Sequence, residues 1–224
     1  MDIDAILAQC ESALAEPGTV DLAELGFWKV VARLKRDPQL VARYGNRVAT
    51  IDQRALGRWA LVMLPIGAGI GAMSLLTVVG LAVVSLAYFV DAPWNGIWVL
   101  LGTGILLGST HTLAHFIVGR IVGIRFTHWF IGRTPQPGVK IDYVSYLATP
   151  PRGRAWMHAS GALTTKLVPF LNLGAAWGSH SPAWTTWILL LLGVVMIGTD
   201  VFLSTKQSDW KKFRREMKYA HQAG

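Results

Sequence analysis

Four long apolar runs constrain this chain more than any other feature of its sequence. They lie within residues 59–90, 96–119, 156–177 and 184–203. A helix of about 20 apolar residues is long enough to cross the hydrocarbon core of a bilayer. The first run exceeds this length, and its early proline and glycines predict an interfacial or kinked lead-in to the span. We therefore expect an all-α polytopic membrane protein with about four transmembrane helices.

The composition agrees with a membrane location. Of the 224 residues, 52% are hydrophobic and 15% are charged, and the mean hydropathy is +0.40, which is too apolar for an ordinary soluble domain. Cys10 is the single cysteine, which excludes an internal disulfide and a cysteine-rich metal site. A bound metal ion would need histidine and carboxylate ligands.

The distribution of basic residues predicts the orientation of the spans. The connections at residues 91–95 and 179–183 contain no lysine or arginine, whereas the loop after the second span and the C-terminal tail are rich in both. By the positive-inside rule, both termini and this long middle loop lie in the cytoplasm. Topology then accounts for nearly all of the formal net charge of +8. We expect the lipid bilayer, and no nucleic acid, among the partners.

The chain divides into three predicted segments. Residues 1–58 form a cytoplasmic N-terminal segment with no visible signal peptide, basic and amphipathic toward its end. Residues 59–205 form the transmembrane domain, and residues 206–224 form a basic cytoplasmic tail. The basic stretch of the first segment stands just before a span, which favours a helix in solvent or on the membrane surface over a nucleic-acid site.

Two histidines in the second apolar run are the clearest chemical signal. His111 and His115 lie four residues apart, so on a helix their imidazoles share one face and can bind one metal ion. This spacing is that of the zinc-protease pattern H-E-x-x-H, whose glutamate takes a proton from metal-bound water. Thr112 stands at the position of that glutamate. The metal-binding half of the pattern is present and the general base is missing.

The predicted topology brings further polar residues to the depth of the histidines. Asp200 lies near the end of the fourth run, and His158 and Lys166 lie in the first turns of the third. Ionisable groups are costly in a bilayer and usually face a partner or a water-filled cavity. His111, His115 and Asp200 would make a three-ligand zinc set with one position left for water or substrate. In the alternative, the histidines make interhelical hydrogen bonds and Asp200 pairs with Lys166 or Lys206 near the interface.

Three segments between residues 100 and 200 follow a recognisable pattern. Residues 111–126 hold the histidine pair and a trailing G-I-R, residues 152–165 a basic run leading into A-S-G-A, and residues 197–200 a terminal carboxylate. Together they resemble the H-E-L-G-H-x-x-x-A-x-x-x-G-I-R-V, A-G-P-x-x-N and fourth-helix segments of the site-2 protease family of intramembrane zinc metalloproteases. The resemblance implies a site-2-protease-like core in which the two histidines and Asp200 bind zinc.

This chain nevertheless lacks several residues of the family's motifs, the catalytic glutamate among them. Its catalytic glutamate falls on Thr112, and the proline and asparagine of its third-helix motif fall on Ala162 and Thr165. A hydroxyl cannot replace a carboxylate as general base at neutral pH, and losing such a base typically costs about 10²–10⁴-fold in rate. The departures predict a member that keeps the fold and a metal while losing peptide hydrolysis.

Two other residues offer unconventional chemistry. His158 can serve as the base for a metal-bound water, and Lys166 can stabilise an oxyanion. With Thr112 they are the candidate catalytic residues. Each also has a simpler role, since Lys166 can extend to the cytoplasmic interface and His158 can lie among headgroups.

The middle loop carries a predicted β-hairpin. Apolar residues alternate with others over residues 126–130 and 139–143, around a turn rich in proline and glycine. In the resembled family, strands at this place lie against an extended substrate segment, which would be β-augmentation. A simple surface hairpin is the alternative.

The leading hypothesis is a metal-binding, proteolytically degenerate membrane protein that recognises a membrane peptide or a partner protein. The first alternative is an active intramembrane zinc metalloprotease or hydrolase with an unconventional base. The second is a structural subunit of a membrane complex, for which abundant tryptophan and small residues provide packing surfaces. Metal content separates the structural subunit from the other two, and turnover separates those two from each other.

Overall fold

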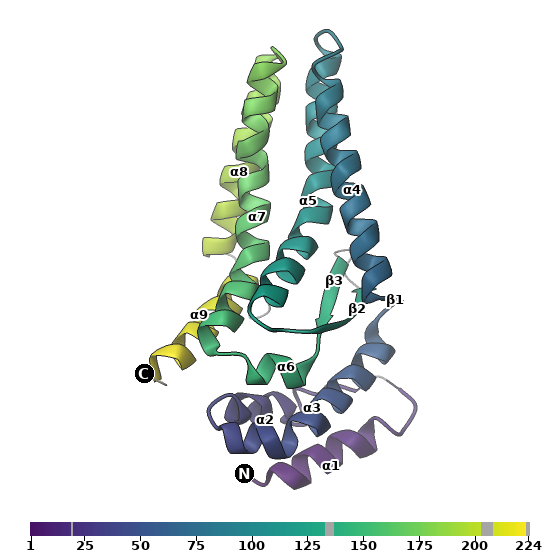
Figure 1. Cartoon of the computed structure of the whole chain (residues 1–224), viewed down its shortest axis with the longest axis vertical. Coiled ribbons are helices and arrows are strands. Elements are labelled where there is room, and N and C mark those ends of the chain that lie inside the picture. The colour runs from purple at the N-terminus through teal and green to yellow at the C-terminus, as the bar shows by residue number, and fades with distance from the viewer. Residues whose placement is uncertain (19, 133–136, 203–207, 223–224) are drawn as a thin grey trace. The chain divides into compact units, whose positions relative to one another are not determined.

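The computed structural model describes residues 1–18, 20–132, 137–202 and 208–222 (Figure 1). Its elements are, in chain order, α1 (Ile3–Ala13), α2 (Phe27–Leu34), α3 (Pro38–Trp59), β1 (Val62–Pro65), α4 (Ile66–Leu86), α5 (Trp94–Ile121), β2 (Phe126–Ile131), β3 (Pro137–Ile141), α6 (Tyr143–Ala148), α7 (Pro151–Gly178), α8 (Ala183–Phe202) and α9 (Asp209–Gln222). They form two compact units. The polar unit comprises Met1–Ile66, Gly119–Arg154 and Glu216–Gly224, and the apolar unit comprises Gly67–Val118 and Ala155–Arg215.

Three of the described helices are long and apolar enough to cross a membrane. They are α4 with 21 residues, α5 with 28 and α8 with 20, and each falls on a predicted span. The chain is mostly helical, and these three long apolar helices indicate a membrane protein. Helix α7 covers the remaining predicted span and has 28 residues, but it is not among the three. Its polar residues, His158, Lys166 and Asn172 among them, make it less apolar.

Small residues let the helices of the apolar unit pack closely. A Cβ atom at Gly102 of α5 would lie 2.4 Å from Cγ2 of Val84 in α4, and one at Gly193 of α8 would lie 2.6 Å from the Phe170 ring in α7. A buried cluster is formed by Ala87, Val99, Leu173, Ala176 and Leu189. Close approach of this kind is how helices associate in lipid, where apolar burial alone gives no driving force.

The outward faces of these helices remain apolar. Leu75 and Val78 of α4 are 65% and 62% exposed, and Leu191 and Val194 of α8 are 64% and 59% exposed. A soluble protein rarely presents so many large apolar side chains along single helix faces. The exposed faces therefore suit contact with lipid tails.

The polar unit contains a three-stranded antiparallel sheet in the order β1-β2-β3. The hairpin of β2 and β3 was predicted from alternation and is confirmed, while residues 133–136 of its turn lie outside the described part of the chain. Strand β1 was not predicted. It pairs with β2 through Val62 opposite Ile131 and Leu64 opposite Trp129. The stretch expected to be a kinked lead-in to the first span is thus a strand followed directly by α4.

Three helices form the N-terminal part of the polar unit. Asp2 caps α1 by accepting a hydrogen bond from the Ala5 amide, and Asp37 caps α3 in the same way, with proline as the first helical residue. The apolar faces of the helices are buried at Ile3, Leu7, Val30, Val31, Leu34, Val48 and Ile51. Arg47 binds Glu11 through two nitrogens, at 2.9 and 2.8 Å.

A buried ionic cluster joins distant stretches of the polar unit. The carboxylate of Glu216, which is fully buried, accepts hydrogen bonds from Lys35, from Arg154 Nε at 2.8 Å and from the Tyr146 hydroxyl at 3.1 Å. The polar unit therefore combines parts of all three predicted segments. The boundaries predicted at residues 58 and 205 do not coincide with the edges of the compact units.

Candidate metal centre

Three ligand atoms converge within the apolar unit. Nε2 of His115 lies 3.1 Å from Nε2 of His111 and 3.1 Å from Oδ2 of Asp209, and His111 Nε2 lies 3.4 Å from the same oxygen. A tetrahedral zinc ion with bonds of about 2.0–2.1 Å holds its ligand atoms about 3.3 Å apart. The three separations therefore match three corners of a zinc tetrahedron. Within the described residues, this is the group of side chains that can hold a metal ion.

Helix α5 supplies both imidazoles. One turn separates His111 from His115, and their ring centroids lie 4.6 Å apart at an angle of 88°. The rings are nearly buried, with side-chain exposures of 14% and 12%. Such rings lose contact with water, so their nitrogens need partners within the protein or a bound ion.

A backbone carbonyl fixes the His115 ring. Nδ1 of His115 lies 2.7 Å from the Met157 carbonyl oxygen in α7, and since a carbonyl only accepts, Nδ1 must carry the proton. A neutral His115 then points the lone pair of Nε2 at the Asp209 oxygen, which is also an acceptor. Two acceptors that face each other repel. A cation bound between His115 Nε2 and the Asp209 oxygen removes this repulsion, and a second proton on the His115 ring would do the same. A histidine that binds a metal through one ring nitrogen usually donates the N–H of the other to a carbonyl, a carboxylate or water, and this hydrogen bond fixes the ring.

Asp209 is the first residue of α9 and is also nearly buried. Lys212, three residues on, donates to its other oxygen, Oδ1, at 3.0 Å. Burial by itself raises the pKa of the Asp209 carboxyl, but the neighbouring imidazoles of His111 and His115 and the charge of Lys212 outweigh burial and hold the pKa below its ordinary range. The carboxylate is therefore ionised, as a metal ligand must be.

Asp200, the carboxylate predicted as third ligand, lies elsewhere in the apolar unit. It forms an ion pair with Lys166, whose ammonium also donates to the Ala162 carbonyl at 3.0 Å. The pairing with Lys166 that was an alternative for Asp200 is thus the one observed, while Lys206 lies outside the described residues. Asp209 stands beside the histidines in its place, and sequence reasoning missed it because it lies in the basic tail.

Thr112 and His158, the other candidate catalytic residues, are buried. Thr112 is 1% exposed, so a buried hydroxyl follows the first histidine where the zinc-protease pattern has a carboxylate. His158 directly follows Met157 in α7 and is 9% exposed. Within the described residues, neither belongs to the group that can hold a metal.

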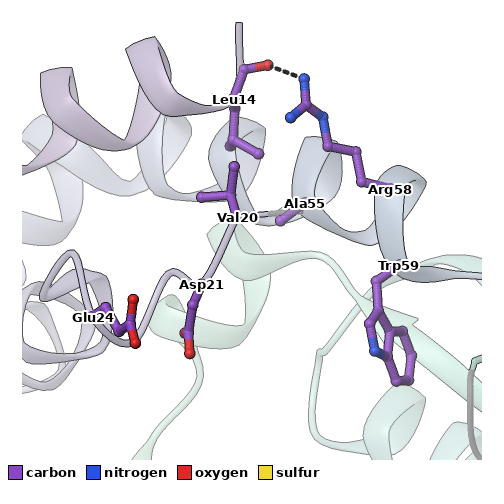
Figure 2. Close-up of a pocket in the computed structure, with 7 residues that line it drawn as sticks. All are labelled: Leu14, Val20, Asp21, Glu24, Ala55, Arg58 and Trp59. Carbon is purple, nitrogen blue, oxygen red and sulfur yellow. Dashed lines mark hydrogen bonds between the residues drawn. The ribbon is translucent and has the colours of Figure 1, made fainter. Parts of the chain in front are cut away.

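A cavity of about 580 Å³ lies in the polar unit (Figure 2). Its lining combines apolar side chains with two carboxylates and a guanidinium: Leu14, Val20, Asp21, Glu24, Ala55, Arg58 and Trp59. The guanidinium of Arg58 binds backbone groups: it donates to the carbonyl oxygens of Leu14 at 2.7 Å and Gly18 at 3.0 Å. The residues predicted to carry chemistry do not line this cavity.

Comparisons of the chain with protein-family models, with curated proteins and with solved structures found no match. The resemblance to the site-2 proteases accordingly rests on the sequence segments alone. The arrangement itself is a His₂Asp group that could hold a metal ion, with both histidines on the apolar helix α5 and the carboxylate on the basic helix α9. Its chemistry is that of a three-ligand metal site without an adjacent carboxylate base.

Proposed function

We propose that this chain is a multi-pass membrane protein that binds zinc through His111, His115 and Asp209 and has lost peptide hydrolysis. In this proposal it is a degenerate relative of the site-2 proteases that recognises a membrane peptide or a partner protein. The observation that carries the proposal is the convergence of the three ligand atoms at 3.1–3.4 Å, with Thr112 at the position of the base. Two imidazoles and a carboxylate are a common zinc set.

The proposed topology has four spans, α4, α5, α7 and α8, with both termini in the cytoplasm. The apolar lengths of α4, α5 and α8 support three of them, and α7 packs against its neighbours through the Asn172 amide, which donates to Thr103 Oγ1 at 2.9 Å. The asymmetry of lysine and arginine between the connections supports the orientation. The metal centre then lies at the cytoplasmic side of the membrane.

Zinc bound here would polarise an oxygen of water or of a peptide carbonyl. Turning such a water into a nucleophile also requires a group to accept its proton, and Thr112 cannot do so at neutral pH. The three protein ligands leave one coordination position open for water or for a ligand atom of the partner.

Strand β3 supports the recognition of an extended segment. Within the described residues it stands at one end of the sheet, with β2 as its neighbouring strand. A strand at the end of a sheet is where an extended peptide can add by β-augmentation. We assign this edge as the place where a peptide of the partner would add to the sheet.

The test is turnover in a membrane. The zinc-loaded native protein, the His111→Ala variant and a chelator-treated sample are incubated in vesicles with a fluorogenic peptide bearing one apolar span. We expect equal background cleavage in all three. Robust cleavage by the native protein that chelator and His111→Ala both abolish would overturn the proposal and favour the active-hydrolase alternative. His158 would then be the first candidate base, because it follows the residue that holds His115, and His158→Gln should abolish turnover without releasing zinc.

A further inference from the structure

Helix α9 presents a basic face on the side away from the metal centre. Lys211, Arg214 and Arg215 are exposed, and none of them has an ion-pair partner within the described residues. At 3.6 residues per turn the three fall within an arc of about 100°. Asp209 lies about 160° from Lys211 around the same helix. One helix thus carries a metal ligand on one side and three unpaired cations on the other.

Trp210 borders this basic face, about 40° from Arg214 around the helix. Trp210 stacks on Phe213 with ring centroids 5.1 Å apart, and Phe213 contacts Trp156 of α7 at 5.7 Å. Trp156 is nevertheless 53% exposed. Tryptophan and basic residues side by side are typical of the zone where a membrane meets water, because the indole prefers the headgroup level.

The chain tethers this surface to the membrane. Asp209 follows Phe202, the last residue of the apolar helix α8, by seven positions, and seven residues reach at most about 25 Å. The tether favours lipid over a soluble partner. Negatively charged headgroups complement the three cations, and each such cation near an anionic surface strengthens binding about fivefold.

We propose that the basic face of α9, formed by Lys211, Arg214 and Arg215 with Trp210 beside it, binds anionic phospholipid headgroups and thereby strengthens metal binding at Asp209. The second half of this inference rests on the proposed function. Anionic lipid and zinc bind opposite sides of α9. Each of them stabilises the same position of this helix. By linkage, each ligand then raises the affinity for the other, and couplings of this kind are typically 5–150-fold.

The test uses full-length protein in nanodiscs, one set of phosphatidylcholine alone and one with added phosphatidylglycerol. Zinc affinity is measured by competition with a chelating indicator, and bound phosphatidylglycerol by native mass spectrometry. The test variant carries Lys211→Gln, Arg214→Gln and Arg215→Gln. A control variant of equal charge change carries Lys29→Gln, Arg33→Gln and Arg54→Gln in the polar unit.

We expect wild type and control to bind zinc at least about fivefold more tightly in the anionic discs. The test variant should match wild type in phosphatidylcholine, show no gain in the anionic discs and retain less phosphatidylglycerol. A gain that persists in the test variant would mean mere accumulation of zinc at a charged surface, and would overturn the coupling. Absence of zinc from wild type in both discs would refute the proposed function. The amount of retained phosphatidylglycerol would still show whether the basic face binds anionic lipid. Equal lipid retention in all three proteins, with loss of binding to a DNA oligonucleotide or an acidic peptide in the test variant, would overturn lipid as the occupant.

Discussion

Gly161 of α7 leaves the space that the His115 ring occupies. A Cβ atom at this position would lie 2.3 Å from His115 Nε2 and 2.6 Å from Cε1, closer than any real contact. Gly161→Ala should therefore displace the ring and lower zinc affinity by about 10–100-fold, the cost typical of disturbing the support of a metal ligand. Gly174→Ala, on the same helix with open space around it, is the matched control and should bind zinc as wild type does. Unchanged affinity in a folded Gly161→Ala protein would contradict the assigned role of His115.

Thr112→Glu restores a carboxylate next to a metal ligand. If the missing base is what prevents hydrolysis, this variant should cleave an apolar-span peptide above the native background, and zinc removal should abolish the gain. Thr165, in place of the family's asparagine, will keep the rate low. Thr112→Gln has nearly the same side-chain size without the charge and should remain inactive. Equal rates for the glutamate and glutamine variants would show that the base is not what is missing.

The ion pair of Lys166 and Asp200 should stabilise the packing of α7 against α8. Removing either charge leaves its partner uncompensated in a poorly hydrated place, so Lys166→Met and Asp200→Asn should each cost about 1–3 kcal/mol of unfolding free energy. The double variant should cost less than the sum of the two. Unfolding of the protein in detergent measures this cycle, and strict additivity would argue against a direct pair.

Glu216 balances two buried cations in the polar unit. Glu216→Gln leaves Lys35 and Arg154 without a counter-charge and should destabilise the protein by about 3–5 kcal/mol near neutral pH. Glu16→Gln, at an exposed position, is the control and should change the melting temperature little.

The same residue gives a pH dependence. Burial alone would raise the pKa of Glu216, but Lys35 and Arg154 outweigh burial and the pKa lies below its ordinary 4.5. A carboxyl with a lowered pKa stabilises the folded state above its unfolded pKa, and this stability is lost as the pH falls through the folded pKa. The difference in melting temperature between wild type and Glu216→Gln should therefore be full at pH 6 and shrink below pH 4.5. A difference that does not change with pH would contradict the charge balance.

Sequence patterns predicted the features that depend on residues close together in the chain. The alternation in residues 126–130 marked β2, and the four-residue spacing marked His111 and His115, because both depend on neighbours in sequence. Strand β1 was missed because Val62–Pro65 continues an apolar run and its partner strand lies more than sixty residues away. The contact of Asp209 with His115 spans 94 residues and depends on where α9 packs, which no spacing records. Asp200 was chosen for its predicted depth in the membrane and by resemblance to a family helix, and its side chain instead meets Lys166.

Zinc content of the purified full-length protein is the most direct test of the His111–His115–Asp209 centre. Wild type, His111→Ala, Asp209→Asn and Asp200→Asn are loaded, passed over a desalting column and measured by elemental analysis. We predict about one zinc per chain in wild type and in Asp200→Asn, and a loss of most of it in His111→Ala and Asp209→Asn. Zinc retained by Asp209→Asn and lost by Asp200→Asn would return the third ligand to Asp200, and equal zinc in all four proteins would leave the histidines as packing residues.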